Sequence, residues 1–251
     1  MNMNFFDCNV FIGLPARRGL YPSAPTTQDI LAEMDFCGVE RALVWHIAQF
    51  DASPQTGNAL LTAAIQQQPR LLGCWAILPN QAHEYPPFET FLEEMRPARV
   101  VALRAFPNDH HFLLNAVAMG SWLEPMVAHR VPLFLSVERG ANWPIVYDLL
   151  AEFPDLVCVI CDHGCWGEDR RFRPLIERYP HVYVDTARYL LDGGIEAFVA
   201  DYGPGRMLFG SGFPVSYLGG MMLALRHARI PEEAKAAIAG KNLERMLAEV
   251  C

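Results

Sequence analysis

The sequence predicts an α/β fold, a single (β/α)8 TIM barrel, and three observations lead to this prediction. Short apolar runs alternate with amphipathic helical patterns along the whole chain, which is typical of βαβ units and a parallel sheet. There are eight such runs, and their starts lie roughly 25 to 36 residues apart, the repeat that a βαβ unit needs. The chain has 251 residues, about the length of one such barrel.

The expected elements follow one another without a gap that would mark a domain boundary, so residues 1–251 are predicted to form one domain. The expected strands are 5–11, 41–45, 71–78, 99–105, 132–137, 156–161, 182–186 and 206–209. The expected helices are 27–37, 58–68, 112–129, 143–153, 169–179, 195–202, 217–228 and 231–250. Helix-breaking residues stand where several of these helices should end: Gly38, Pro69, Pro97, Pro154 and Pro180. An open doubly wound sheet is the alternative, but no strand is followed by a G-x-G-x-x-G or Walker loop.

Composition excludes several classes of protein. An apolar fraction of 52% with 19% charged residues is too hydrophobic for a disordered chain. The net charge of −8 and the absence of a basic cluster argue against a nucleic-acid partner. No signal peptide and no long apolar stretch is recognisable, which predicts a cytoplasmic protein without a membrane partner. Seven cysteines in such a chain indicate free thiols.

The active site of such a barrel lies at the carboxyl ends of its strands and in the loops that follow. The residues at the strand ends are therefore the positions to search for chemistry. They are Asp7, Asn9 and Phe11, then His46, Leu78, Asn80, Arg104, Ser136, Glu138, His163, Asp185, Ser211 and Gly212.

Five motifs in order give the chain a family resemblance. They are FDCNVFIG at residues 6–13, VPLFLS at 131–136, PDL at 154–156 leading to DHG at 162–164, LFGSGFP at 208–214, and AGKNLERML at 239–247. With these motifs the chain resembles the amidohydrolase-related superfamily, the metal-dependent TIM-barrel hydrolases and decarboxylases. The resemblance covers nearly the whole length and implies the same barrel.

The metal centre that the resemblance implies is largely replaced. Its ligand positions, two His on the first strand, one His each on the fifth and sixth, and an Asp on the eighth, here hold Asn9, Phe11, Ser136, His163 and Gly212. Phe and Gly have no side-chain donor for a cation. We therefore expect no metal and no cofactor. A rebuilt site from Cys158, Cys161, His163 and Cys165 is the alternative, and buried structural thiols are favoured over it.

A metal-free site needs a base, a residue that orients it, and an electrophilic group. His163 is the expected base, oriented by Asp7 or Asp185. Arg104 is expected either to bind a substrate carboxylate or to form an ion pair with Glu138 or Asp7. Glu138 is either an acid–base group or a solvated partner of Arg139 or Arg104.

The remaining candidates are expected to line the pocket. His46 is either a substrate contact or a hydrogen-bonded wall residue, and Asn9 and Ser136 are counted among the substrate-binding groups. Trp166, Trp75 and Trp143 provide stacking faces or pack against loops. His110 and His111 are expected to be exposed loop residues, with a lid role for residues 109–111 as the alternative.

Three functions remain open. The first is an enzyme, a metal-independent hydrolase of a small ester, lactone or amide-like carboxylate substrate. The second is a non-catalytic barrel that binds a small anion or a protein partner, and a homo-oligomer is compatible with both. The third is anion binding by the glycines at 210, 212, 219 and 220, because loops after the last strands of many barrels bind phosphate.

Overall fold

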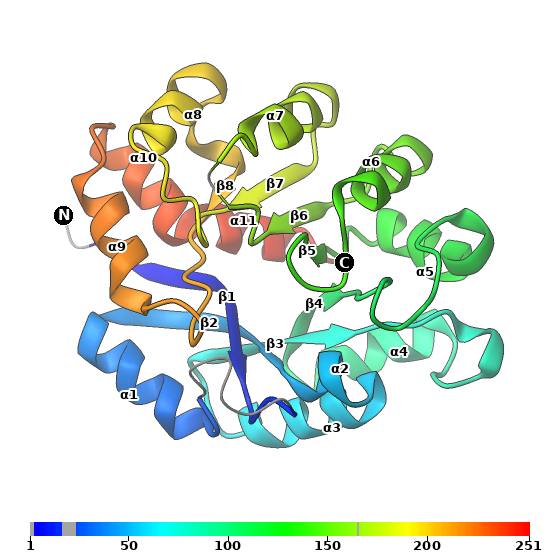
Figure 1. Ribbon diagram of the computed structural model, residues 1–251. Helices are drawn as coiled ribbons and strands as arrows, with labels where there is room; N and C mark the ends of the chain where they lie inside the picture. The colour runs from blue at the N-terminus through cyan, green and yellow to red at the C-terminus, as the bar shows by residue number, and fades with distance from the viewer. Residues whose placement is uncertain (1–2, 17–23, 165) are drawn as a thin grey trace.

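The computed structural model describes residues 3–16, 24–164 and 166–251. Eight parallel strands follow one another in chain order around a barrel, and helices surround them (Figure 1). This confirms the predicted (β/α)8 architecture. The strands are β1 (Phe5–Ile12), β2 (Val39–His46), β3 (Leu71–Ala76), β4 (Val100–Arg104), β5 (Leu133–Ser136), β6 (Cys158–Cys161), β7 (Val182–Asp185) and β8 (Met207–Leu208).

The helices alternate with the strands, and two of them were not predicted. They are α1 (Thr27–Cys37), α2 (Ala48–Asp51), α3 (Pro54–Ile65), α4 (Phe88–Met95), α5 (Ala116–Ala128), α6 (Trp143–Glu152), α7 (Asp169–Arg178), α8 (Gly194–Tyr202), α9 (Leu218–His227), α10 (Glu232–Ala236) and α11 (Asn242–Ala248). The unpredicted helices are α2, a single turn, and α4, which connects β3 to β4. The helix expected at 231–250 is interrupted by a π-helical turn, Ala237–Lys241.

Local signals in the sequence explain where several helices begin and end. Thr26 caps α1 and forms a reciprocal capping box with Asp29, while Gly38 ends the helix in the left-handed conformation at φ +79°. Asn115 and Asn142 cap α5 and α6 through their side-chain oxygens. These caps satisfy backbone N–H groups that have no partner inside the helix.

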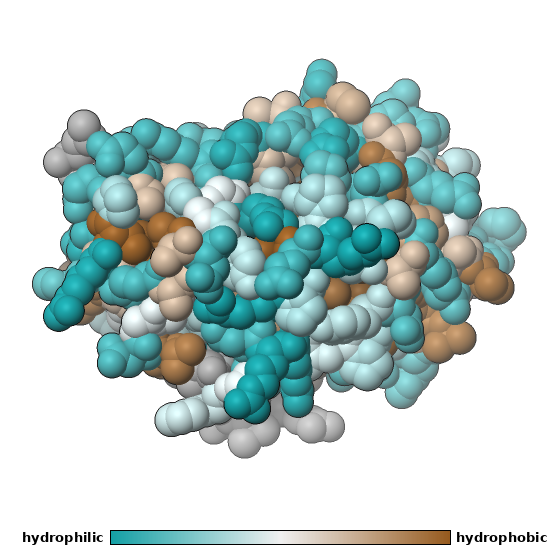
Figure 2. All heavy atoms as spheres, turned by 90° about the horizontal axis from the view of Figure 1, so that it is seen from above, coloured by the Kyte–Doolittle hydropathy of each residue, from teal (hydrophilic) through white to brown (hydrophobic). Residues whose placement is uncertain are grey.

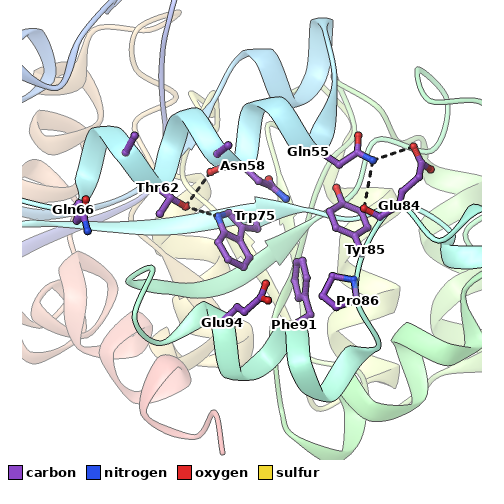
Figure 3. Close-up of a pocket in the computed structure, with 12 residues that line it drawn as sticks. Gln55, Asn58, Thr62, Gln66, Trp75, Glu84, Tyr85, Pro86, Phe91 and Glu94 are labelled. Atoms are coloured by element: carbon purple, nitrogen blue, oxygen red, sulfur yellow. Dashed lines mark hydrogen bonds between the residues drawn. The ribbon is translucent and has the colours of Figure 1, made fainter.

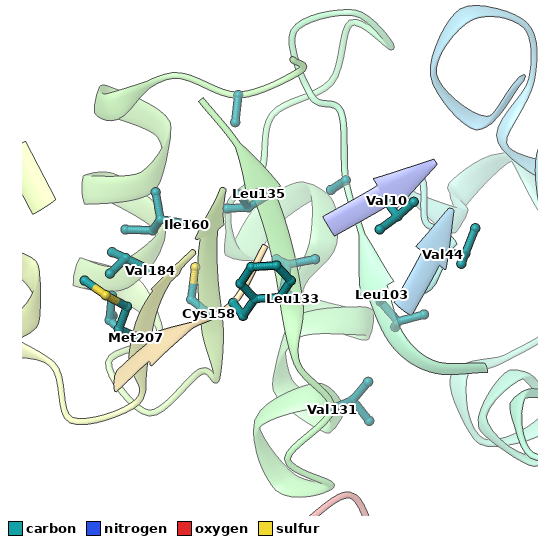
Figure 4. Close-up of a cluster of buried hydrophobic side chains, with 14 of the residues drawn as sticks. Val10, Val44, Leu103, Val131, Leu133, Leu135, Cys158, Ile160, Val184 and Met207 are labelled. Atoms are coloured by element: carbon teal, nitrogen blue, oxygen red, sulfur yellow. The ribbon is translucent and has the colours of Figure 1, made fainter. Parts of the chain in front are cut away.

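Side chains alternate between two apolar cores. Leu133, Leu135, Cys158 and Ile160 point outward into the core between strands and helices (Figure 4). Their neighbours along the strands, such as Phe134 and Cys161, fill the inside of the barrel. Cys158 and Cys161 therefore face opposite sides of the sheet.

The barrel is closed between its first and last strands by backbone hydrogen bonds. Cys8 N donates to Phe209 O at 2.9 Å, Phe11 N to Phe213 O at 3.1 Å, and Gly212 N to Asn9 O at 3.1 Å. The π-helical turn lies beneath this junction, where Phe209 N donates to Ile238 O at 2.9 Å. The two ends of the sheet therefore meet next to the residues that the sequence marks as the site.

The outer face of the molecule is mainly polar. Figure 2 shows hydrophilic residues over most of the face seen from above, with apolar side chains in small separate groups. Among the described residues, no helix has the length and apolar character needed to cross a membrane.

Candidate functional site

Three strand ends meet in a buried polar centre. Asn9 on β1 donates through Nδ2 to Asp162 Oδ1 at 2.9 Å and to Asp185 Oδ2 at 2.8 Å. Asn9, Asp162 and Asp185 are 3%, 5% and 0% exposed. One amide group thus links two carboxylates from β7 and the end of β6.

Further polar residues complete this centre. Arg104 on β4 donates through Nη2 to Asn9 Oδ1 at 3.1 Å. Ser136 on β5 donates to Asp162 Oδ2 at 2.7 Å, and Arg139 Nη1 lies 3.4 Å from the same oxygen. Both oxygens of Asp162 therefore accept at least one hydrogen bond.

The backbone conformation of Asp162 explains why its carboxylate faces the centre. Strand β6 ends at Cys161, and Asp162 adopts a left-handed conformation with φ +55°. Asp tolerates this conformation better than most residues because its short polar side chain forms local hydrogen bonds. The turn breaks the side-chain alternation of the strand and directs His163 away from the centre.

His163 consequently has surroundings that differ from the prediction. Its ring packs against Phe172 at 4.8 Å and Tyr189 at 5.1 Å between centroids. Its Nε2 lies 2.9 Å from the backbone oxygen of Asp185 and its Nδ1 3.1 Å from that of Gly164. The expected carboxylate partner is thus replaced by main-chain carbonyls. Burial lowers the pKa of His163, and these carbonyls oppose the shift.

Asp185 has the electrostatic environment of a carboxyl group that holds its proton. Burial raises its pKa well above the usual value, and the nearby charge of Asp162 raises it further. The hydrogen bond from Asn9 opposes this increase. Two neighbouring carboxylates in a buried site do not both ionise readily, so the pair favours one ionised and one protonated member.

Asp7 lies beside the centre at the junction of β1 and β8. Its Oδ1 accepts from Asn9 N at 3.1 Å and Ser211 N at 3.0 Å, and it does not orient His163 as one alternative predicted. Its Oδ2 is buried without a hydrogen-bond partner among the described residues. Burial raises the pKa of Asp7 to about 6, and hydrogen bonds with Ser211 and Asn9 oppose the shift.

Arg104 is enclosed beneath Asn9 and is 1% exposed. Its guanidinium carbon lies 4.8 Å from the ring centroid of Trp45. Its Nε and Nη1 have no hydrogen-bond partner among the described residues. The expected ion pair with Glu138 or Asp7 is not formed, since Arg104 instead donates to an amide oxygen.

Glu138 and His46 lie at the rim of the mouth. Glu138 forms an ion pair with Arg188 and not, as one alternative predicted, with Arg139 or Arg104, because the β7 loop brings the Arg188 guanidinium against it. His46 accepts a hydrogen bond from Ala48 N through Nδ1 at 3.1 Å, which places its proton on Nε2. Burial lowers the pKa of His46, opposed by the charge of Asp51.

A cavity of about 360 Å³ opens beside the centre. His163, Trp166, Arg188, Leu190 and Ser216 are among its lining residues. Trp166 is 89% exposed and Leu190 69% exposed, so the cavity combines the Arg188 guanidinium and the Glu168 carboxylate with two accessible apolar side chains.

Gly212 separates this cavity from Asp162. A Cβ at this position would lie 3.8 Å from both Asp162 Oδ1 and Ser216 Oγ, and Ser216 lines the cavity. A Cβ at position 212 would be in ordinary van der Waals contact with its neighbours, Ala187 Cβ at 3.5 Å included, so glycine leaves a gap of about one methyl group between the cavity and the carboxylate. Its φ of +70° also favours glycine here.

The other aromatic candidates lie outside the mouth. Trp75 packs on Phe91 outside the barrel, and Trp143 begins α6 and donates to Glu168 at 2.7 Å. His110 is half-buried, not exposed as predicted, because its ring packs on Phe106 and its Nε2 lies 3.2 Å from Phe50 O. His111 is exposed, as expected.

The glycine-rich loop after β8 does not offer free amides to an anion. Gly210 N donates to Thr186 Oγ1, Ser211 N to Asp7 and Gly212 N to Asn9 O. Gly220 N donates to Tyr217 O. These internal hydrogen bonds remove the donors on which the anion-binding hypothesis for this loop depends.

The donor set in the centre does not suit a divalent cation. Phe11 and Gly212 offer no side-chain donor, and the Asn9 oxygen already accepts from the Arg104 guanidinium. In residues 3–16, 24–164 and 166–251, no group of three or more His, Cys, Asp or Glu side chains is placed to hold a metal ion. Cys165, one member of the alternative cysteine and histidine site, lies outside the described residues.

The sequence reasoning missed Asp162 and Arg139 as site residues. The resemblance implies a His163 that points into the barrel, but the left-handed turn at Asp162 brings the Asp162 carboxylate into the centre in its place. An Asp directly at a strand end and before a His-Gly pair was the available signal, since Asp is one of the few residues enriched in that conformation.

Comparisons with known proteins agree with this architecture. The profile of the family described as Amidohydrolase (Amidohydro_2) matches residues 13–248. No curated protein matches the chain.

Solved structures of similar fold share little sequence with the chain. The 5-carboxyvanillate decarboxylase from Sphingomonas paucimobilis is 15% identical, with a TM-score of 0.75 over 98% of this chain and 99% of that one. A probable 2-pyrone-4,6-dicarboxylic acid hydrolase from Acinetobacter baumannii, with citric acid bound, is 15% identical, with a TM-score of 0.71 over 98% and 100%. The 2,6-dihydroxybenzoate decarboxylase from Rhizobium is 14% identical, with a TM-score of 0.73 over 98% and 99%.

Proposed function

The chain belongs to the amidohydrolase family, and from this premise we propose that it is a metal-independent hydrolase of a small ester, lactone or amide that carries a carboxylate. The observation that carries the proposal is the pair of carboxylates Asp162 and Asp185, linked by Asn9 at the mouth of the barrel. Three similar structures are named for action on substrates with carboxylate groups, which supports a carboxylate in the substrate.

The proposed chemistry assigns different tasks to the two carboxylates. Asp162 is the general base: it takes a proton from water as the water oxygen adds to the acyl carbon, and returns that proton to the leaving alkoxide or amine as the C–O or C–N bond breaks. Asp185 is fully buried and has a raised pKa, so it is the protonated member of the pair beside Asp162. This assignment replaces His163, whose ring nitrogens both lie against backbone carbonyls.

The substrate is proposed to occupy the cavity beside the centre. Arg188 lines this space, and arginine binds carboxylates through two parallel hydrogen bonds. Trp166 and Leu190 provide the apolar contact. His46 and Glu138 are proposed to contact the substrate at the rim of the mouth. Arg104, Asn9 and Ser136 are positioning residues, which hold the Asp162 carboxylate in place through their hydrogen bonds.

Metal independence is part of the same proposal. The Asn9 amide group lies between the two carboxylates, and the Arg104 guanidinium already bonds its oxygen. The fixed Arg104 guanidinium would repel a divalent cation bound beside it. The side chains that bind a metal in the family are also replaced at these positions.

Activity of an Asp162→Asn variant tests the proposal. A panel of small lactones and esters, each with a carboxylate, is offered to the wild type and the variant in the presence of a chelator. We expect wild-type turnover and a loss of about 10²- to 10⁴-fold in kcat for Asp162→Asn, because it removes the base but keeps the side-chain volume. The exposed Asp155→Asn is the matched control and should keep full activity.

Equal turnover in Asp162→Asn and the wild type would reject Asp162 as the base. Turnover that is lost with the chelator and restored by a transition metal would reject metal independence.

A non-catalytic barrel that binds a small anion is the second candidate. It is favoured by one observation: both oxygens of Asp162 already accept hydrogen bonds within the protein. Saturable binding of carboxylates in calorimetry, with no turnover on the whole panel, would select this function over catalysis.

A further inference from the structure

Arg104 is a buried cation whose charge has no partner in contact with it. Its side chain is 1% exposed, and its Nη2 donates to the neutral amide oxygen of Asn9 at 3.1 Å. Its Nε and Nη1 are buried without a hydrogen-bond partner among the described residues. A guanidinium remains ionised inside a protein, and a buried charge that is left unpaired is strongly destabilising. Buried charges are therefore normally paired, and Arg104 lacks such a pair.

The carboxylates of the polar centre do not supply this pair. Among the described residues, Asp162 forms its ion pair with Arg139, whose Nη1 lies 3.4 Å from Asp162 Oδ2. Burial and the charge of Asp162 raise the pKa of Asp185 well above its usual value, so Asp185 is neutral. Asp7 uses its Oδ1 to bind backbone N–H groups. The hydrogen bonds and ion pairs of these carboxylates are thus made with other groups than the Arg104 guanidinium.

Trp45 provides a second buried donor beside Arg104. Its side chain is 1% exposed, and its ring centroid lies 4.8 Å from the guanidinium carbon. Its Nε1 has no hydrogen-bond partner among the described residues. Buried N–H groups are nearly always hydrogen-bonded, so each exception needs an explanation, an enclosed ion among them. Two neighbouring side chains therefore present donors without acceptors in the same part of the barrel interior.

Small side chains line the interior around the guanidinium. Cys74 and Ala76 of β3, Ala102 of β4 and Cys161 of β6 all belong to the inner core, where large branched residues are usual in such barrels. Burial raises the pKa of Cys74 to about 11 and that of Cys161 well above its usual value. Both thiols are therefore neutral and do not balance the charge of Arg104. Side chains of this size are compatible with a monatomic ion between them.

We propose that the barrel interior encloses a small monovalent anion of the size of chloride, held by the Arg104 guanidinium and the Trp45 indole N–H. The anion is the counter-ion of Arg104 and accepts hydrogen bonds from buried donors. Because both donors are fully buried, the anion is enclosed when the barrel closes and is part of the folded protein. It is distinct from the substrate at the mouth, and the proposal does not depend on hydrolysis.

Thermal denaturation of the full chain in chloride tests the proposal. Potassium chloride replaces potassium gluconate stepwise at constant ionic strength, because gluconate is too bulky for an enclosed site. We expect Tm to rise saturably by about 3 °C or more, since a ligand that binds only the native state opposes unfolding. Bromide should have a similar effect. A Tm that is equal in chloride and gluconate, as a water molecule at this position would give, would overturn the proposal.

The variant Trp45→Phe locates the site, because it removes the indole N–H and keeps an aromatic ring. It should raise the chloride concentration at half of the Tm increase by about tenfold. Trp75→Phe is the matched control: the Trp75 indole donates to Thr62 outside the barrel (Figure 3). This control should respond to chloride as the wild type does. An equal response of the two variants would contradict the proposed location.

A crystal of the full chain grown in bromide gives the position directly. We expect an anomalous peak in contact with Arg104 and Trp45. Peaks at the protein surface alone would indicate an adventitious ion only and would reject the enclosed site. Arg104→Met removes the charge that requires the ion, so the Tm of this variant should not respond to chloride. A response equal to that of the wild type would also reject Arg104 as the anion ligand.

Discussion

At the scale of single residues, Asp7 has a side chain whose ionisation costs free energy in the folded protein. Its carboxyl group is fully buried, and only one of its oxygens has a hydrogen-bond partner among the described residues. Because folding raises its pKa from 3.8 to about 6, the native protein retains a proton that the unfolded chain has already lost. Stability from this group is present below about pH 4 and is lost as the pH rises through about 6.

We therefore predict that Asp7→Asn reduces the pH dependence of unfolding. The free energy of unfolding of the variant, relative to the wild type, should increase between pH 4 and pH 7 by up to about 3 kcal/mol, the value of a two-unit pKa shift. Urea denaturation at several pH values measures it. Asp29→Asn should change in the opposite direction and at lower pH, below about pH 4, because Thr26 lowers the pKa of Asp29 from its usual 3.8. Parallel pH curves for Asp7→Asn and the wild type would contradict the prediction.

Single residues also set the limit of what the sequence could predict about the site. Asn9, Ser136 and Asp185, which the sequence marks as strand-end candidates, lie together in the buried centre, because parallel strands carry their carboxyl ends to one side. The role expected for His163 rested on the family resemblance and on the pKa of an imidazole near neutrality. The left-handed backbone of Asp162 changes the directions of the Asp162 and His163 side chains. The regular alternation of side chains along a strand cannot predict such a residue.

At the scale of elements, the π-helical turn supports the base of β1. A Cβ on Gly240 would lie 2.8 Å from Asn4 O and 3.3 Å from the backbone nitrogen of Phe6. Gly240→Ala should therefore lower the free energy of unfolding by about 1–3 kcal/mol through overpacking against backbone atoms.

Gly220→Ala is the matched substitution with the opposite expected sign. Gly220 lies in α9, and a Cβ there would meet no atom within 4 Å. Alanine should stabilise this helix by about 0.5–1 kcal/mol. Thermal denaturation measures the change in stability of both variants. A Gly240→Ala variant more stable than the wild type would contradict the prediction and show that the turn has room to move.

The elements themselves were largely predictable, and the exceptions have physical reasons. All eight strands were located, since each is a short apolar run bounded by helical patterns. Helix α4 was missed because it has only eight residues and begins after Pro87, without a polar capping side chain. The π-helical turn was missed because it results from close packing beneath β1 and leaves the helical pattern of the sequence unchanged.

At the scale of the whole molecule, metal independence predicts how the protein responds to a chelator. A metal bound at a hundred times its Kd would stabilise the fold by about 2.7 kcal/mol, which is several degrees in Tm for a chain of this length. We expect a change in Tm below about 1 °C after EDTA treatment. Differential scanning calorimetry before and after dialysis measures it. A fall of several degrees that added zinc reverses would contradict the prediction.

The junction between β1 and β8 has a consequence for the order in which the protein matures. The hydrogen bond from Ser211 N to Asp7 joins positions 204 residues apart, and Asn9 bonds Asp185 across 176. Contacts of such separation form slowly, because the long intervening loop must first be closed. A ribosome-bound chain that ends before residue 185 exposes the inner faces of its strands and has no polar centre. We therefore expect dependence on chaperones to be greatest just before β7 and β8 are synthesised.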